Sequence, residues 1–263
     1  MSFTKVKKGV CAAKGFVANG LNCGLNSDKN KNDLALVYSE TQCQAAAVYT
    51  TNKVKGAPIQ VTKAHLEASG HTAKAVIANS KNANTCNADG VEKAQRMCEL
   101  AAAELSIDPN EVIVASTGVI GQVLPIEPIE SHIKELAKGL SADGNDKAVN
   151  AIMTTDTVPK QYAVKFMLGD CECTVGGMAK GSGMIHPNMA TTLNFITSDV
   201  AISSELIQKA LSEIVKVTYN CLSIDGDTST NDMVSIMANG LAGNTPITTE
   251  NDDYQIFKDA LYE

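Results

Sequence analysis

The residue pair with the most distinctive chemistry is a threonine that follows an alanine after a glycine-rich stretch. Gly181 and Gly183 allow backbone geometries that other residues avoid, and Pro187 restricts the chain shortly before Ala190 and Thr191. Attack of the Thr191 hydroxyl on the Ala190 carbonyl would form an ester that water opens. The new chain would begin with Thr191, whose α-amine, with a pKa of ~7.7–8.0, can serve as base for its own hydroxyl. The alternative is a glycine loop that leads into an edge strand.

A second pair follows a predicted buried strand. The run 111–115 is apolar apart from its first residue, and Ser116, Thr117 and Gly118 come directly after it. Loops beyond strand ends often carry functional groups. The Thr117 hydroxyl and the Gly118 N–H would together make an oxyanion hole, which stabilises the negative oxygen of a tetrahedral intermediate. The alternative is a simple transition from strand to loop.

Two polar segments remain open in function, and no metal site is predicted. Residues 152–160 hold three threonines and an aspartate, which fit either a polar pocket or a turn without a ligand. Residues 225–232 resemble the start of a calcium loop, but Thr230 stands where glycine is required and Ile236 where glutamate is required. The eight cysteines and four histidines show no zinc-ligand spacing, so the cysteines are interpreted as small buried residues of a reducing compartment.

Interleaved strand and helix patterns position these groups and predict a mixed α+β or α/β fold. Gly169 and Asp170 form a two-residue turn that predicts a hairpin. The expected strands are 45–49, 75–78, 111–115, 162–168, 171–178, 193–197 and 233–238, and the expected helices are 58–67, 91–105, 128–140, 143–152, 203–217 and 252–263.

Composition excludes several classes of protein. The 263 residues carry a net charge of −7, which disfavours binding to nucleic acid. Neither a secretory signal nor an apolar run of the ~20 residues needed to span a membrane is present. The motifs GxxxxGK[ST], GxGxxG and GxSxG are also absent.

Taken together, the motifs resemble the bifunctional ornithine acetyltransferase family, also called glutamate N-acetyltransferase or arginine biosynthesis protein J. The resemblance runs in order along essentially the whole chain. The matching segments are 9–10, 15–16, 48–52, 57–58, 78–84, 116–118, 153–157, 159–160, 180–184, 187–191 and 225–232.

The resemblance implies an α/β sandwich that cleaves itself between Ala190 and Thr191, so that residues 1–190 correspond to an α chain and 191–263 to the start of a β chain. Thr191 would carry acetyl from N-acetylornithine to glutamate, and Thr117 and Gly118 would form the oxyanion hole. Thr157, Lys180 and Thr191 correspond to substrate-binding positions. No cofactor is implied, although acetyl-CoA is a possible acetyl donor. The expected location is the cytoplasm, with the cleaved chains paired in a heterotetramer and without nucleic-acid or membrane partners.

Departures from the family pattern leave two alternatives. Family members usually have glycine at Lys81 and an apolar residue at Thr192, and they continue beyond residue 263. The chain is therefore either an acetyltransferase or an incomplete fragment without turnover, and a related self-cleaving amidase or aminopeptidase is a third alternative. We expect little transfer from these 263 residues alone, and an exposed apolar stripe of Tyr254, Phe257 and Leu261 on the last helix.

Overall fold

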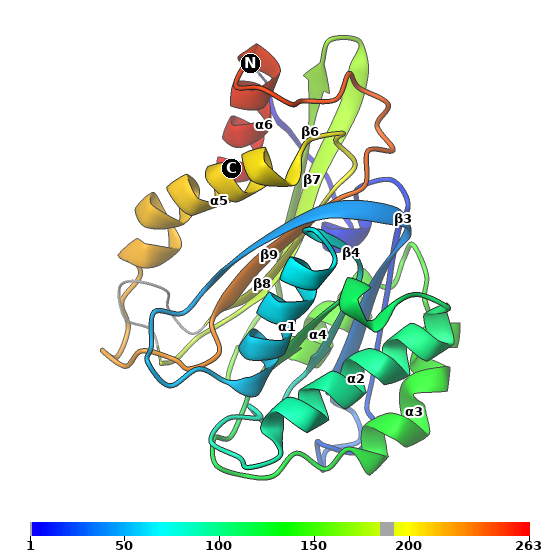
Figure 1. Cartoon of the computed structure of the whole chain (residues 1–263), viewed down its shortest axis with the longest axis vertical. Coiled ribbons are helices and arrows are strands. Elements are labelled where there is room, and N and C mark those ends of the chain that lie inside the picture. Colours follow the sequence, from blue (N-terminus) through cyan, green and yellow to red (C-terminus); the bar gives the residue numbers. More distant parts are fainter. Residues whose placement is uncertain (1, 185–191) are drawn as a thin grey trace.

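One large mixed β-sheet organises the chain (Figure 1). The structure is a computed structural model and describes residues 2–184 and 192–263. In this part of the chain the sheet order is β1-β6-β7-β8-β9-β3-β4-β5, and β2 pairs with β3 off this path. The strands are β1 (Thr4–Lys5), β2 (Phe16–Leu21), β3 (Leu34–Tyr49), β4 (Thr72–Asn79), β5 (Val112–Ser116), β6 (Lys160–Leu168), β7 (Cys171–Lys180), β8 (Leu193–Ser198) and β9 (Met233–Ala238).

Two parallel pairs distinguish this sheet from a simple meander. β4 runs parallel to β5 and β8 runs parallel to β9, whereas the other pairs are antiparallel. β3 is long enough to join the two halves, because residues 34–39 pair with β2 and residues 44–49 pair with β9. All six residues of β9 are buried, as expected for a central strand with both faces covered.

Helices cover the sheet in two groups. The helices are α1 (Ala57–Ala68), α2 (Gly90–Leu105), α3 (Glu127–Lys138), α4 (Asn145–Ile152), α5 (Ser204–Val217) and α6 (Asp252–Tyr262). Figure 1 shows α1, α2 and α3 gathered at the β4 end of the sheet, with α5 and α6 at the other end. α4 packs on β2 and β3. Pro58 and Pro128 lie in the first turns of α1 and α3, where a missing N–H leaves no helical hydrogen bond unmade.

Three apolar clusters form the core. The first packs α1, α2 and α3 on β3, β4 and β5, and includes Ile77, Met97 and Val114. The second lies beneath α5 and α6 and includes Ile236 and Phe257. The third packs the short helix α4 near the middle of the sheet, with side chains from β2, β7 and β8. The core thus supports both ends of the sheet.

Most of the elements expected from the sequence are confirmed, including the 169–170 hairpin, which pairs Leu168 with Cys171. The strand expected at 45–49 is the last third of β3, while β1, β2 and the first part of β3 were not expected. The expected exposed stripe on α6 is wrong: Tyr254 and Phe257 are buried against the cluster beneath α5, and Leu261 is half-buried and packs on the same cluster. Among the described residues, no helix has the length and apolar character to cross a membrane.

Candidate active site

Thr117 is held where β5 ends. Its N–H donates to the Asn79 carbonyl at 3.0 Å, and the Val119 N–H donates to the Lys81 carbonyl at 3.1 Å. The loop that follows β4 therefore pairs with the loop that follows β5, as expected for two parallel neighbours whose carboxyl ends share one edge. Thr117 itself is 5% exposed. This pairing fixes the direction of the Thr117 side chain.

Gly118 occupies a position that only glycine fills without strain. Its φ is +136°, and a Cβ there would lie 2.1 Å from the Lys81 carbonyl carbon. Among the described residues, no acceptor takes the Gly118 N–H. Lys81 has a φ of 76°, the left-handed region in which glycine is favoured, so the lysine that departs from the family pattern stands at a strained position.

Lys180 brings a buried positive charge to Thr117. It is the last residue of β7, it is 3% exposed, and its Nζ donates to Thr117 Oγ1 at 3.2 Å. Burial lowers the pKa of Lys180 from its usual value, and the charges of Asp156 and Asp232 oppose this effect. Thr117 and Lys180, both predicted from the sequence, are therefore in direct contact.

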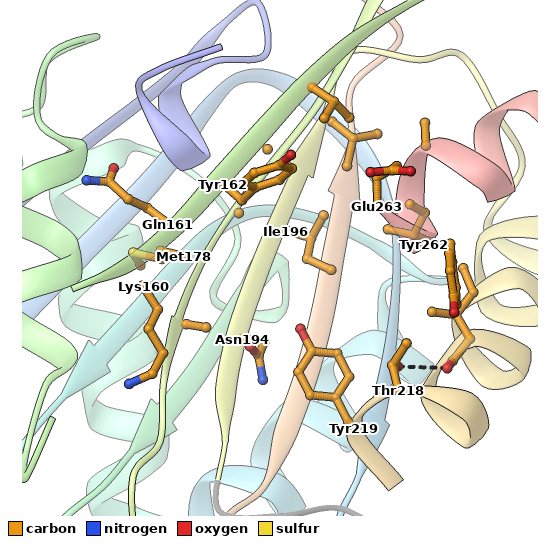
Figure 2. Close-up of a pocket in the computed structure, with 18 of the residues that line it drawn as sticks. Lys160, Gln161, Tyr162, Met178, Asn194, Ile196, Thr218, Tyr219, Tyr262 and Glu263 are labelled. Atoms are coloured by element: carbon orange, nitrogen blue, oxygen red, sulfur yellow. Dashed lines mark hydrogen bonds between the residues drawn. The ribbon is translucent and has the colours of Figure 1, made fainter. Parts of the chain in front are cut away.

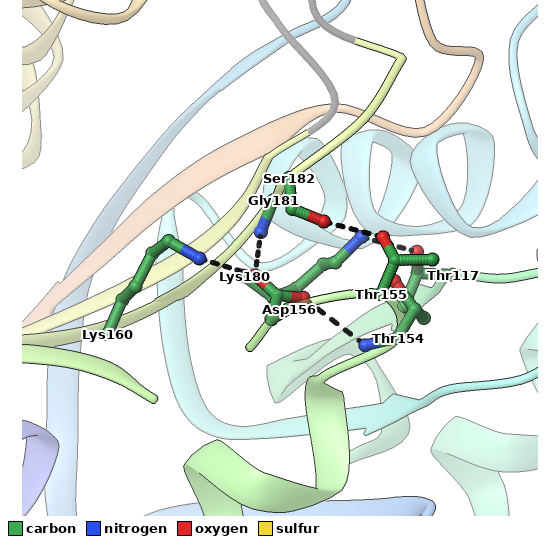
Figure 3. A network of polar contacts seen from close by, with 8 residues as sticks. All are labelled: Thr117, Thr154, Thr155, Asp156, Lys160, Lys180, Gly181 and Ser182. Atoms are coloured by element: carbon green, nitrogen blue, oxygen red, sulfur yellow. Dashed lines mark hydrogen bonds and ion pairs between the residues drawn. The ribbon is translucent and has the colours of Figure 1, made fainter. Parts of the chain in front are cut away.

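Asp156 links the residues around Lys180 (Figure 3). Its carboxylate accepts from Lys160 Nζ at 2.5 Å, from the Gly181 N–H at 2.9 Å and from the Thr154 N–H at 3.2 Å. These three donors outweigh burial and lower the pKa of Asp156, although burial is the largest single influence on it and acts to raise it. Asp156 thus joins the loop before β6 to the end of β7.

Asn231 supports the same edge of the sheet from the segment before β9. Its Oδ1 accepts from the hydroxyls of Thr85 and Thr230, each at 2.6 Å, and its Nδ2 donates to the carbonyls of Ala83 at 2.6 Å and Ser116 at 2.9 Å. All four hydrogen-bonding positions of the amide are used. Asn231 therefore holds the residue before Thr117 in place.

Asp232 is a fully buried carboxyl beside the start of β8. Its Oδ1 accepts from the Thr192 N–H at 3.1 Å, and its residue is 0% exposed. Burial raises the pKa of Asp232 to about 7, partly offset by Ser229, the Thr192 N–H and Lys180. The group is therefore close to half-ionised near neutral pH.

Several of these residues line a cavity of about 410 Å³, whereas Asp156 and Asp232 lie outside its lining. Thr117, Gly118 and Lys180 line it together with Thr154, Thr155 and Asn231. Thr157 is exposed and is not among the lining residues, so its predicted substrate-binding role stays a prediction. Ala190 and Thr191 lie outside the described residues, so the predicted cleavage site and nucleophile also stay predictions.

Several polar groups at the site had no assigned role in the sequence. Asn231 and Asp232 belong to the segment 225–232, which carried the family resemblance but no chemistry of its own. Thr85 belongs to the polar loop 79–85. The sequence signal that could have identified these residues is their position: each is a polar residue close to the end of a strand. The buried ring of His65 contacts the Val112 carbonyl and Gln95, and His65 does not line this cavity.

Comparisons with known proteins agree on one family. The ArgJ family model matches residues 17–263. The arginine biosynthesis bifunctional protein ArgJ 1 of Clostridium acetobutylicum is 50% identical over 248 residues, which are 94% of this chain and 60% of that protein. The ArgJ protein of Bacillus subtilis is 48% identical over 258 residues, which are 98% of this chain and 62% of that protein.

Solved structures give the same result. A crystal structure of ArgJ from Bacillus halodurans has a TM-score of 0.66 and 39% identity, and it covers 72% of this chain and 98% of that one. Ornithine acetyltransferase from Mycobacterium tuberculosis, complexed with ornithine, has a TM-score of 0.65 and 35% identity, with coverage of 73% and 100%.

The overall fold extends to more distant proteins. An l-aminopeptidase d-ala-esterase/amidase from Ochrobactrum anthropi, a variant of the Ntn hydrolase fold, has a TM-score of 0.58 at 10% identity, covering 100% of this chain and 86% of that one. This likeness concerns the fold alone. The chain spans about 60% of the length of the curated relatives that it matches, and over that span it belongs to the ArgJ family.

Proposed function

We propose that the chain carries the acetyl-transfer site of an ornithine acetyltransferase. In this proposal the chain cleaves itself between Ala190 and Thr191, and Thr191 then moves acetyl from N-acetylornithine to glutamate. The main support is the pair formed by the Thr117 hydroxyl and the Gly118 N–H, which lie side by side in one cavity with the buried Lys180. Membership of the ArgJ family supports the choice of substrates.

The proposed reaction has two half-reactions that share the oxyanion hole. The Thr191 oxygen attacks the acetyl carbonyl, and the resulting oxyanion accepts hydrogen bonds from Thr117 and Gly118. The Thr191 α-amine takes the hydroxyl proton and passes it to the ornithine nitrogen as the bond from carbon to that nitrogen breaks, and acetyl stays on Thr191 as an ester. The amine of glutamate then attacks the ester, and the proton it loses returns to the Thr191 oxygen.

Lys180 supplies the positive charge that an amino-acid substrate requires. An ammonium has three N–H donors, and one of them is used by Thr117. The remaining donors are suited to the α-carboxylate that ornithine and glutamate share. In our proposal acetyl-CoA is a possible second acetyl donor, the cleaved chains stay paired in a heterotetramer, and the location is the cytoplasm.

Intact-mass measurement tests this function. We expect the purified protein to appear as two chains that meet between residues 190 and 191, and N-acetylornithine to add one acetyl group to the chain that begins with Thr191. Thr191→Ala should stay uncut, whereas Thr191→Ser should cut slowly, because a hydroxyl is retained. Cleavage of the alanine variant at this bond, or an acetyl group on the other chain, would contradict the proposal.

A further inference from the structure

The contact between Lys180 and Thr117 joins two residues that are 63 positions apart in the sequence. Figure 3 shows the Lys180 side chain extending from the end of β7 to Thr117, beyond the end of β5. Both residues are almost fully buried, at 3% and 5% exposure, and the two atoms are 3.2 Å apart. Burying an ammonium costs free energy unless its N–H groups are hydrogen-bonded. The contact with Thr117 therefore stabilises the buried charge.

The chemistry of the two groups fixes the direction of the hydrogen bond. An ammonium can only donate, whereas a hydroxyl has one hydrogen to donate and two lone pairs that accept. Thr117 must therefore accept from Lys180, and its own hydrogen is directed elsewhere. Within residues 2–184 and 192–263, Thr117 Oγ1 has no second partner. The hydrogen is thus available to the cavity that the Gly118 N–H also borders.

Burial lowers the pKa of Lys180 overall, but two nearby carboxylates stabilise its charged form. Asp156, before β6, and Asp232, before β9, both attract the ammonium, while Lys160 on β6 repels it. A neutral Lys180 would have a lone pair able to accept the Thr117 hydrogen. The direction of the bond would then reverse, and the hydroxyl would be lost as a donor to the cavity.

We propose that Lys180 is a positioning residue for the oxyanion hole: its ammonium occupies a lone pair of Thr117 Oγ1 and turns the hydroxyl hydrogen toward the carbonyl oxygen of the acetyl donor. This role rests on the proposed acetyl transfer and is separate from the binding of a substrate carboxylate. The carboxylate role requires a carboxylate on the donor, whereas the positioning role operates with any acetyl donor.

An acetyl donor without a carboxylate therefore separates the two roles. The probe is 4-nitrophenyl acetate, whose acetyl group passes to the nucleophile with release of 4-nitrophenolate. The rate of acetylation of Thr191→Ala measures acetylation of other side chains and is subtracted as background. The set consists of the wild type, Lys180→Met, Thr117→Ala and the double variant. Lys165→Met is the control, because Lys165 is a half-exposed lysine of β6 that pairs with Glu172 and does not line the site cavity.

We expect Thr117→Ala to slow acetylation by ~10²–10³-fold, the usual effect of losing one oxyanion donor. Lys180→Met should slow it by at least ~10-fold, because an unrestrained hydroxyl spends most of its time in other rotamers. The double variant should match Thr117→Ala, since Lys180 acts through Thr117. Lys165→Met should stay near the wild type. A Lys180→Met rate equal to the wild type, or fold-changes that multiply in the double variant, would overturn the proposal.

The pH profile gives a readout that a purely structural role would not change. The wild-type rate should fall at alkaline pH as Lys180 loses its proton, and this fall should be absent from Thr117→Ala. The same fall in both proteins would overturn the positioning role.

If the proposed acetyl transfer is wrong, the experiment gives a result that differs from failure of the positioning role alone. In that case the wild type acetylates no faster than Thr191→Ala, and the midpoint of denaturant unfolding decides the pairing of Lys180 with Thr117 instead. Non-additive midpoint shifts in the four proteins support the pairing, and additive shifts overturn it.

Discussion

Two cavities of nearly equal volume border β7, and they differ in the polar groups that they hold. The site cavity, of about 410 Å³, is lined by Lys180, and the groove between the sheet and helices α5 and α6, of about 420 Å³, is lined by Ala179. These two lining residues are neighbours at the end of β7. Figure 2 shows the groove, with Ile196, Tyr219 and Asn194 facing it.

A buried asparagine in each region makes the difference concrete. Asn231 uses all four positions of its amide. Asn194 in the groove is 1% exposed, and neither of its amide atoms has a hydrogen-bond partner within the described part of the chain. The site cavity holds a buried ammonium, Lys180, that donates to Thr117, whereas the charged residues that line the groove, Lys160 and Glu263, are not buried. Volume therefore does not locate the chemistry; the fixed polar groups do.

The largest contrast is expected from the same substitution in each cavity. Thr117→Ala removes a donor to the oxyanion and should lower the acetylation rate by ~10²–10³-fold, or ~2.7–4 kcal/mol. Thr218→Ala in the groove removes only a hydroxyl that donates to the Ile214 carbonyl, so the rate should stay near the wild type. Single-turnover acetylation measures both. Equal rates for the two variants would assign the chemistry to a different pair of donors.

The next effect concerns stability at the site. Asn231→Leu leaves two hydroxyls and two carbonyls without their partner, so the free energy of unfolding should fall by ~3 kcal/mol. Acetylation should also slow, because the Asn231 amide holds Ser116, which precedes Thr117. Urea unfolding measures the first effect. A change below ~1 kcal/mol would mean that the network contributes little to the fold.

The sequence predicted the parts of the molecule with local signals. Period-3.6 patterns located the helices, and the Gly169-Asp170 turn located the hairpin, because these features depend on residues close in the chain. Thr117, Gly118 and Lys180 were likewise predicted from motifs, and the structure brings them to one cavity.

The missed parts depend on contacts between distant segments. β2 contains Asn19 and Gly20, which are typical of a turn, yet Gly20 is needed because a Cβ there would lie 2.1 Å from the Lys147 carbonyl. β3 carries polar residues and a register shift between Tyr38 and Cys43, which interrupt the pattern of a strand. The contacts of Asn231 with Ala83, Thr85 and Ser116 span more than 100 residues, and no local pattern encodes them.

A third prediction uses the buried carboxyl beside the start of β8. Because the pKa of Asp232 is raised to about 7, the folded state holds its proton more tightly than the unfolded state does. The contribution of Asp232 to stability is therefore largest below pH ~4 and is lost as pH rises toward ~7, by up to ~1.4 kcal/mol per pH unit.

Asp232→Asn should remove this dependence while an amide oxygen still accepts from the Thr192 N–H. In urea unfolding at pH 5, 6, 7 and 8, the free energy of unfolding of the variant should increase relative to that of the wild type as pH rises. Asp227→Asn, an exposed aspartate of the same segment, is the matched control and should not change the slope. A parallel slope for Asp232→Asn would place the titrating group elsewhere.

The smallest expected effect is a gain in stability from a leucine substitution in the groove, opposite in sign to the loss expected from Asn231→Leu at the site. Asn194→Leu replaces two buried polar atoms that make no hydrogen bond by an apolar side chain of similar size, in a groove whose walls include Val164, Val175 and Ile196. Removing the desolvation cost of an unpaired amide should raise the free energy of unfolding by ~1 kcal/mol. The same substitution at Asn231 is expected to lower it, so urea unfolding of the two leucine variants compares the two cavities directly. Loss of stability in both would show that the Asn194 amide is paired in solution, and the groove would then resemble the site more closely than its contacts indicate.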